Sequence, residues 1–158
     1  MYNNIQWKIK LFKELSLDEL YDLLKLRVDV FVVEQTCYYP DLDNADRHIN
    51  TIHLIGYDHS EGQTSKLAAY LRILPQGETY DNYISIGRVA TAANYRGQGL
   101  GHQLMQQALQ ACNKYFTQQE IKISAQEHLE HYYNKYGFIK VSAMYLEDNI
   151  PHIAMLKQ

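Results

Sequence analysis

The stretch ISIGRVATAANYRGQGLGHQLMQQALQAC, residues 84–112, joins three patterns that together decide the fold. A β-like run over residues 83–91 comes first, and a glycine-rich turn follows it. Apolar side chains then recur every three or four residues, like the buried stripe of an amphipathic helix: Leu100, Leu104, Ala108, Cys112 and Tyr115. With a further β-like run at residues 121–125, this order predicts a strand–helix–strand unit, in which the two strands are parallel and the crossover is right-handed.

The turn RGQGLG, residues 96–101, has the features of an anion site. Glycines let the backbone approach a ligand closely, and the first N–H groups of a helix have no partner within the helix. The helix dipole adds about half a positive charge there, and Arg96 offers a fork of donors to phosphate oxygens. We therefore expect a phosphate or pyrophosphate at this turn. The alternative is a glycine-rich turn without a ligand.

The exact register of the turn excludes two familiar phosphate sites. A P-loop has a Lys-Ser/Thr pair after its last glycine, whereas His102 and Gln103 follow here. A dinucleotide fingerprint has the register G-x-G-x-x-G, whereas this turn reads G-x-G-x-G. By its motif, the turn is therefore neither a P-loop nor a dinucleotide-binding turn.

One helix is predicted near the N-terminus. Ser16 and Glu19 have the spacing of a capping box, and apolar residues at helical spacing continue to about Val32. The helix should end near the Glu34-Gln35 pair, and a loop with several Asp residues should follow over residues 36–50.

The remaining elements are β-like runs and one further helix. Residues 127–136 read as a helix that Gly137 ends. The β-like runs are residues 7–11, 53–57, 66–74, 83–91, 121–125, 138–145 and 152–156, with turns predicted at 59–65 and at Asp148-Asn149. The turn at 59–65 predicts a hairpin, and the three consecutive runs at 53–57, 66–74 and 83–91 predict an antiparallel meander. This order predicts a single domain, residues 1–158, of α/β or α+β class: a mixed, twisted sheet of about seven strands flanked by helices.

Length and composition narrow the class of protein. A chain of 158 residues with 46% hydrophobic and 21% charged residues is typical of one soluble globular domain. A net charge of −3 gives no electrostatic footprint for nucleic acid. The longest apolar run, residues 67–71, is far shorter than the roughly 20 residues of a membrane span. With no visible signal peptide and only two cysteines, we expect a cytoplasmic protein with no nucleic-acid or membrane partner.

Taken in this order, the motifs resemble the GNAT superfamily of N-acyltransferases. Arg96-x-x-Gly99-x-Gly101 is similar to the acetyl-CoA pyrophosphate motif of that family, residues 84–91 to its cofactor-pairing strand, and YYNKYGF at 132–138 to its F/Y-Y-x-x-x-G-F element. The segments that resemble the ElaA-type branch are RVDVFVVEQ (27–35), YPDLD (39–43), AQEHL (125–129) and EDNIPHI (147–153). The resemblance thus covers most of the chain. It implies a GNAT-like fold with CoA in a V-shaped notch, acetyl-CoA as co-substrate, and direct acetyl transfer to a primary amine.

The resemblance also implies a set of cofactor contacts. Thr91 stands where the family often has an aliphatic residue, and Gln126 where it commonly has an Asn that contacts the cofactor. The strand residues would pair with the pantetheine arm through their backbone, and the turn would hold the pyrophosphate. The implied cofactor-binding residues are Val89, Ala90, Thr91, Arg96, Gly97, Gln98, Gly99, Leu100, Gly101, Gln126 and Tyr133.

Catalytic and acceptor-binding roles follow from the same resemblance. Tyr133 is the implied general acid, because the CoA thiolate that leaves needs a proton. Glu34 and His152 would lie on opposite walls of the acceptor site, and either could be the base. Arg88 could bind an acidic group of the acceptor, or could form an ion pair with Glu34 or Asp43. Tyr133 and Glu34 are thus the candidate catalytic residues, and Arg88 and His152 the candidate substrate-binding residues.

Three further interpretations stay open at this stage. His128 and His131 are three residues apart on a predicted helix, but no HExxH motif or third ligand accompanies them, so we expect no metal. A non-catalytic acyl-CoA-sensing module is one alternative function, and a longer-chain acyltransferase related to acyl-homoserine-lactone synthases is another. The acceptor, a small-molecule or peptide amine, is not identified by the sequence, and a homodimer is a further implication of the family.

Overall fold

The computed structural model describes residues 4–60, 62 and 64–158. The turn predicted over residues 59–65 therefore lies partly outside the described residues, at positions 61 and 63. The two strands that it joins, β2 (Ile52–Asp58) and β3 (Lys66–Leu74), pair antiparallel, as the hairpin prediction requires.

The first half of the chain forms a four-stranded antiparallel sheet in the order β1-β2-β3-β4. β1 (Ile5–Leu11) pairs with β2, and β4 (Ser85–Thr91) pairs with β3. All four strands lie where the sequence predicts them, with ends that differ by one or two residues. The antiparallel meander is confirmed.

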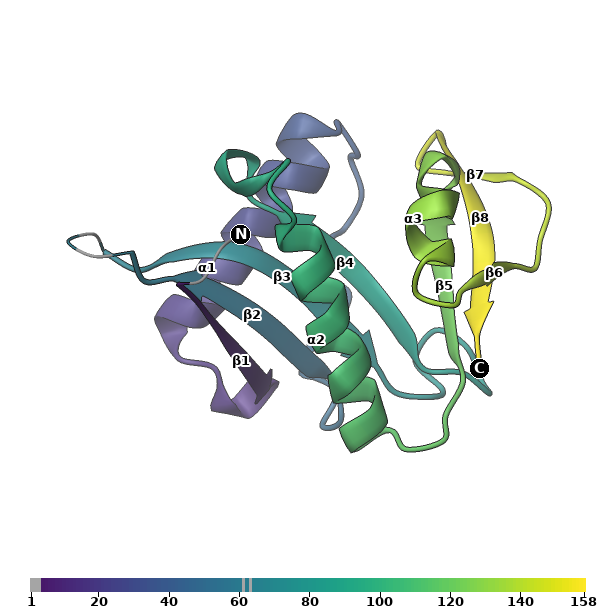
Figure 1. Cartoon of the computed structure of the whole chain (residues 1–158), viewed down its shortest axis with the longest axis horizontal. Helices are drawn as coiled ribbons and strands as arrows, with labels where there is room; N and C mark the ends of the chain where they lie inside the picture. The colour runs from purple at the N-terminus through teal and green to yellow at the C-terminus, as the bar shows by residue number, and fades with distance from the viewer. Residues whose placement is uncertain (1–3, 61, 63) are drawn as a thin grey trace.

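The second half forms a separate sheet around β8 (Ile150–Lys157), which pairs antiparallel with β5 (Ile121–Gln126), β6 (Ile139–Lys140) and β7 (Tyr145–Glu147). The two sheets meet at one parallel bridge, between Ile84 and Ile121. Ile84 N donates to the Glu120 carbonyl at 3.1 Å, and Lys122 N donates to the Ile84 carbonyl at 2.9 Å. Beyond this bridge β4 and β5 diverge (Figure 1), so the predicted mixed sheet is split in two.

The prediction of one continuous strand over residues 138–145 is wrong. β6 and β7 are two short strands that pair with the same strand, β8, and residues 141–144 between them belong to neither. At the break, the side-chain Oγ of Ser142 accepts the Ala154 amide at 2.8 Å. A side-chain acceptor thus takes the place of a backbone carbonyl, and the regular ladder is interrupted there.

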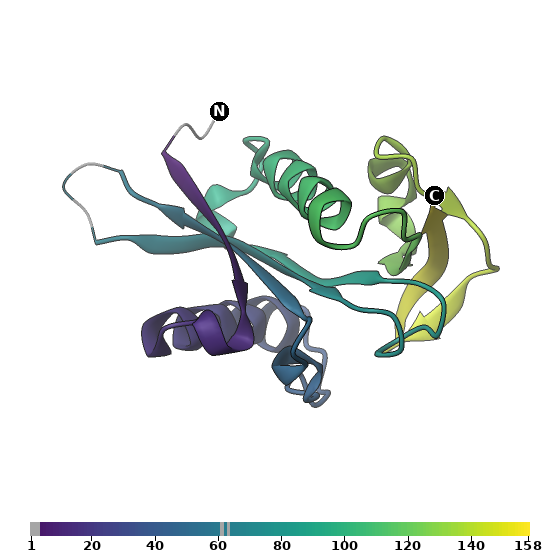
Figure 2. The ribbon, with the colours of Figure 1, turned by 90° about the horizontal axis from the view of Figure 1, so that it is seen from below.

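Two long helical segments cover opposite faces of the first sheet (Figure 2). α1 (Leu17–Arg27) begins at the predicted capping box, in which Ser16 Oγ accepts the Glu19 amide at 3.0 Å and Glu19 Oε1 accepts the Ser16 amide at 2.9 Å. The chain stays helical to Glu34, but Val28–Glu34 is a π-helical segment. α2 (Leu100–Tyr115) lies on the other face. Four members of the predicted stripe are buried, Leu100, Leu104, Ala108 and Cys112, whereas the prediction is wrong for Tyr115, which is exposed at the end of the helix.

The two faces of the sheet have separate apolar cores. The α1 side packs Leu23, Leu26 and Val30 against residues of β2 and β3 such as Tyr70. The larger core joins α2 to the first sheet and to β5, β8 and Phe138. Because this second core continues into the second sheet, it fixes the position of β5 beside β4 and hence the geometry of the split.

The predicted helix over residues 127–136 is present as two shorter pieces. A 3-10 turn at Glu127–Leu129 leads into α3 (Glu130–Asn134). Gly137 ends this region with a φ of +88°, a left-handed conformation that glycine adopts readily. The residue predicted to stop the helix is therefore the one that does so.

Candidate functional site

A cavity of about 950 Å³ opens where β4 and β5 diverge. Its walls come from both strands, the glycine-rich turn, α3, the π-helical segment and the hairpin between β7 and β8. All the site residues predicted from the sequence line this cavity except Gln98: Glu34, Arg88, Val89, Ala90, Thr91, Arg96, Gly97, Gly99, Leu100, Gly101, Gln126, Tyr133 and His152. The fold thus brings together residues that are more than 110 positions apart in the chain.

The glycine-rich turn has the backbone geometry of an anion site. Gly97 and Gly99 have φ values of +78° and +84°, and α2 begins directly after Gly99. A Cβ at either glycine would meet no atom within 4 Å, so the requirement here is the left-handed backbone and not space. The turn therefore leaves the N-terminus of α2 open toward the cavity.

Arg96, at the start of this turn, is held by two residues outside it. Its Nε donates to the Thr91 carbonyl at 3.0 Å, and its Nη1 and Nη2 donate to the two carboxylate oxygens of Glu34 at 2.6 and 2.8 Å. This ion pair holds the pKa of Glu34 below its usual range. Glu34, a predicted base, is thus a paired carboxylate with weakened basicity.

The π-helical segment also reaches the opposite wall of the cavity. The Gln126 side-chain amide, on β5, donates to Gln35 Oε1 at 3.4 Å. Glu34 and Gln35 are neighbours in the chain, yet one contacts the glycine-rich turn and the other contacts β5. The end of this helical segment therefore links the two walls.

Tyr133 is buried, with only 8% of its surface exposed, and still lines the cavity. Its ring meets Tyr132 and Phe138 edge-on, with centroids 5.1 and 5.9 Å away. Burial raises the pKa of Tyr133 to about 12. Among the residues that the structure describes, none forms a hydrogen bond with the Tyr133 hydroxyl, whereas the Tyr132 hydroxyl donates to the Gly101 carbonyl at 2.8 Å. Of these two adjacent tyrosines, Tyr133 is thus the one whose hydroxyl is available to a ligand.

Arg88 faces two carboxylates. Its Nε lies 2.9 Å from Asp41 Oδ1, and its Nη2 lies 3.3 Å from Asp43 Oδ2. The guanidinium also stacks over the Tyr39 ring, 5.0 Å from its centroid. Of the alternatives for Arg88, the structure contains the ion pair with Asp43, while Glu34 pairs with Arg96 instead.

A buried ion-pair network behind this wall was not predicted from the sequence. Arg27 is fully buried and donates to Asp41 and Asp46 at 2.8 Å each. Arg72 donates to the same oxygen of Asp46 at 2.9 Å and to both oxygens of Asp43. The only signal in the sequence was the concentration of Asp in residues 36–50. This loop is therefore pinned to α1, β3 and β4 by charge.

The β7–β8 hairpin forms the far wall. Asp148 and Asn149 have φ values of +49° and +62°, so the predicted two-residue turn is present. His152 Nδ1 lies 2.7 Å from the Ile150 carbonyl, and its Nε2 lies 3.2 Å from Glu147 Oε2. Both ring nitrogens of this second predicted base thus have partners. Glu147 itself was missed as a candidate, although it lies inside a quoted motif.

The cysteines are poorly suited to nucleophilic chemistry. Cys37 lines the cavity, and burial raises the pKa of its thiol. Cys112 belongs to the core, where burial raises its thiol pKa to about 12. Because the thiolate is the nucleophile, neither residue is activated for covalent catalysis.

Two features are absent from residues 4–60, 62 and 64–158. No group of three or more His, Cys, Asp or Glu residues in these ranges is placed to hold a metal ion. No helix there is both long and apolar enough to cross a membrane.

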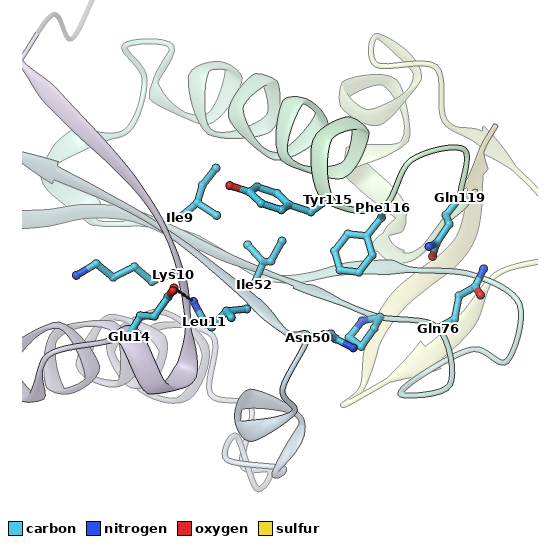
Figure 3. A pocket seen from close by; sticks show the side chains of 11 residues that line it. Ile9, Lys10, Leu11, Glu14, Asn50, Ile52, Gln76, Tyr115, Phe116 and Gln119 are labelled. Carbon is cyan, nitrogen blue, oxygen red and sulfur yellow. Dashed lines mark hydrogen bonds between the residues drawn. The ribbon is translucent and has the colours of Figure 1, made fainter.

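A second cavity, of about 600 Å³, lies between β1 and the end of α2 (Figure 3). Its walls are apolar side chains, including Ile9, Ile52 and Phe116, and amides such as Gln119. Its one carboxylate, Glu14, accepts the Leu11 amide at 2.8 Å. None of the site residues predicted from the sequence lines it, and its polar groups do not converge on a common point (Figure 3). We therefore assign the functional site to the cavity between β4 and β5.

Comparisons with known proteins show the family. A family model described as an acetyltransferase (GNAT) domain matches residues 52–158. Protein ElaA of Escherichia coli (strain K12) is 39% identical over 154 residues, which cover 98% of this chain and 97% of ElaA. The crystal structure of E. coli ElaA has a TM-score of 0.89 at 38% identity and covers 98% of this chain and 99% of its own.

Two other solved structures bear on the fold. An acyl-CoA N-acyltransferase from Pseudomonas aeruginosa has a TM-score of 0.90 at 44% identity, covering 98% of this chain and 99% of its own. The CoA-dependent acyl-homoserine lactone synthase BjaI has a TM-score of 0.67 at 18% identity, covering 89% of this chain and 76% of its own. At that identity the likeness to BjaI concerns the fold alone.

Proposed function

This chain belongs to the GNAT acetyltransferase family, in the ElaA-type branch, and is an acyltransferase; from that premise we propose that it transfers the acetyl group of acetyl-CoA directly to a primary amine. The observation that carries the proposal is the divergence of β4 and β5 beside the glycine-rich turn. The free edge of β4 can pair with the amides of a pantetheine arm as an added strand would. The N-terminus of α2 then receives the pyrophosphate.

The residues that would hold the cofactor fit its chemistry. Gly97 and Gly99 leave the turn without side chains, so main-chain N–H groups can approach phosphate oxygens. Arg96 lies at the start of the same turn and supplies the guanidinium. Thr91 and Gln126 lie on the two diverging strands, where the pantetheine arm would pass.

Direct transfer is favoured over a covalent acyl-enzyme. The one thiol in the cavity wall, Cys37, has a raised pKa, so little of it is thiolate near neutral pH. In direct transfer the amine attacks the thioester carbonyl, the C–S bond breaks, and the electron pair leaves with sulfur. The group that this mechanism needs in the wall is a hydrogen-bond donor to sulfur.

Tyr133 supplies that donor. With its pKa at about 12, it stays protonated at every pH at which the enzyme would work. A thiol has a pKa of about 8.5, so complete proton transfer from Tyr133 to the thiolate is uphill. The Tyr133 hydroxyl therefore acts mainly by donating a hydrogen bond to sulfur as negative charge develops there.

The acceptor amine must lose a proton to become nucleophilic. Glu34 is paired with Arg96, and both ring nitrogens of His152 have partners. We expect the proton to leave through water in the open cavity. The rate at subsaturating amine should then rise with pH as the free-amine fraction increases.

The test has two arms. Calorimetry with acetyl-CoA measures cofactor binding, and thiol release across a panel of primary amines measures turnover. Binding together with amine-dependent thiol release supports the proposal. Binding without release for any amine would support the acyl-CoA-sensing module, and no binding would overturn the cofactor assignment. A comparison of turnover with acetyl-CoA and with longer acyl-CoA thioesters shows which acyl-chain length the protein prefers.

A further inference from the structure

We propose that Glu147 selects the acceptor, and that the acceptor is a cationic amine with no acidic group near the reacting nitrogen. This inference rests on the function proposed above, because it names the substrate class of the same cavity. It follows from how Glu147 is held and from the charges that face it.

Glu147 is fixed in place but still accessible. It is the last residue of β7, opposite Ile150, at the start of the two-residue turn. His152 Nε2 lies 3.2 Å from its Oε2, and Ser124 Oγ donates to its Oε1 at 3.3 Å. Its side chain is nevertheless 50% exposed and lines the cavity. Each carboxylate oxygen thus has one fixed neighbour and retains acceptor capacity for an ammonium group.

Three strands contribute to this arrangement. Ser124 lies on β5, Glu147 on β7 and His152 on β8, and β8 pairs with both of the others. The Tyr145 ring stacks on the His152 ring with a centroid distance of 6.3 Å and an angle of 23°. His152 is therefore a positioning residue for Glu147, held in turn by its bond to the Ile150 carbonyl.

The other charged groups in the cavity wall point to the same acceptor class. Each arginine that lines the cavity already has a carboxylate partner: Arg72 with Asp43 and Asp46, Arg88 with Asp41 and Asp43, and Arg96 with Glu34. An acidic group on the acceptor would have to displace one of these partners. It would also be repelled by Glu147 and Asp148, which line the same wall.

An aromatic surface lies in the same wall and suits a cation. Tyr80 lines the cavity. Its ring and that of Tyr83 already hold one cation in this structure: the ammonium of Lys122 lies 4.9 Å from the Tyr80 centroid and 5.5 Å from the Tyr83 centroid. Tyrosine rings attract cations through their π-electrons. A carboxylate beside such rings is the chemistry that recognises an alkylammonium group.

The kinetic test compares n-butylamine with 4-aminobutyrate, which have the same carbon count and differ by a carboxylate. In the wild-type protein kcat/KM should favour n-butylamine by about tenfold or more, because Glu147 and Asp148 repel the carboxylate of 4-aminobutyrate. Glu147→Gln should raise the KM for n-butylamine about tenfold, the size expected for a lost hydrogen bond to a charged group, with a smaller change in kcat. The same variant should reduce the preference to below threefold, because one repelling charge is gone. Glu147→Asp keeps the charge and should keep the preference.

A matched control is available near the start of α1, outside the cavity. Asp18, in the first turn of α1, is exposed and outside the cavity. Asp18→Asn removes the same charge from the protein and should leave both kinetic constants unchanged. An equal loss for both acceptors in Glu147→Gln, or a wild-type preference for 4-aminobutyrate, would overturn the proposal.

An equilibrium measurement keeps the inference separate from turnover. The thermal midpoint of the CoA-loaded protein is measured in butylammonium chloride and in sodium butyrate at equal ionic strength. The cation should raise the midpoint of the wild type, Glu147→Asp and Asp18→Asn, but not of Glu147→Gln. No shift in the wild type, or an equal shift by butyrate, would overturn the role of Glu147 even where CoA binds. Failure of the proposed function would instead appear as absence of CoA binding.

Discussion

The two ends of the cavity are built in different ways. The cofactor end uses main chain: two left-handed glycines, a helix N-terminus and the edge of β4. The acceptor end uses side chains from separate elements, with Glu147, His152 and Arg88 each held by charged or hydrogen-bonded partners. A main-chain site depends on one short segment, whereas a side-chain site depends on many elements being in place. The two ends should therefore fail differently when single residues are changed.

The largest effect is expected behind the acceptor end, on stability. Burial raises the pKa of Asp46, but Arg27 and Arg72 outweigh this and hold it below the usual value. Asp46→Asn leaves both guanidinium groups partly unpaired, and we expect it to lower the free energy of unfolding by about 3 kcal/mol. Urea unfolding at pH 7, with Asp18→Asn as the exposed control, measures the loss.

The contribution of Asp46 to the free energy of unfolding should depend on pH in a defined direction. A carboxylate whose pKa is lowered in the folded state stabilises the protein above its unfolded pKa of about 3.9, and that stability is lost as the pH falls through the folded value. The difference between wild type and Asp46→Asn should therefore be complete at pH 7 and should begin to shrink only as the pH falls below the unfolded pKa of about 3.9. A difference that did not shrink at all in acid would mean that packing, not charge, holds the loop.

The next largest effect is expected at the cofactor end, on binding. Gly99→Asp should weaken acetyl-CoA at least a hundredfold, since a carboxylate would replace the anion at the start of α2. Gly99→Asn is the matched control, because Asn tolerates a left-handed backbone about as well as Asp but has no charge. Calorimetry should find that Gly99→Asn loses only severalfold in affinity for acetyl-CoA. Equal losses would show that backbone strain and not charge is responsible.

The same difference, between features built from one short segment and features built from several elements, explains which parts of the fold could be predicted from the sequence. The glycine-rich turn, the Ser16 capping box and Gly137 are local signals, because each depends on residues within a few positions of one another. The strands and helices were accordingly located to within a few residues. The split of residues 138–145 was missed because it depends on Ser142 meeting Ala154 across the sheet.

The same distinction applies to the candidate site. Every predicted cofactor residue except Gln98 lines one cavity, since most of them lie in residues 89–101. The pairing of Arg96 with Glu34 spans 62 positions, and the contact of Ser124 with Glu147 spans 23. Such contacts depend on the folded arrangement of the sheets, and no local pattern reveals them. Glu34 and His152, the two predicted bases, therefore both have partners in the structure that the sequence did not identify.

Between the two ends lies Tyr133, which tests whether they cooperate. Tyr133→Phe should keep CoA affinity and lower the single-turnover rate by about ten- to a hundredfold, because it removes a positioned donor. Because burial places the pKa of Tyr133 near 12, the loss should be the same at pH 7 and at pH 9.5. A loss that disappeared at pH 9.5 would mean that Tyr133 titrates in this range and acts as a full proton donor. Tyr132→Phe, which affects the bond to Gly101, is the control for ring packing.

A smaller effect is expected for Arg96, whose side chain at the cofactor end already has a carboxylate partner. Its guanidinium makes two short contacts with Glu34, so a phosphate must share or displace that carboxylate. Exposed ion pairs contribute little, and we expect Arg96→Ala to weaken acetyl-CoA only about three- to tenfold. A pantetheine thioester that lacks phosphates should bind both proteins equally.

Glu34→Gln shows in which direction the ion pair acts on the cofactor. If Glu34 competes with phosphate for the guanidinium, removing its charge should tighten acetyl-CoA binding about two- to threefold at low salt, and the gain should shrink at high salt, where exposed charges are screened. In the Arg96→Ala background the same Glu34→Gln change should have a smaller effect, because the partner is gone. Weaker binding in Glu34→Gln alone would mean that Glu34 orients Arg96 toward the phosphate. Arg96 would then depend on a side chain from another element, as the residues of the acceptor end do. The main-chain part of the cofactor site would consist of the glycines, the helix N-terminus and the edge of β4 alone.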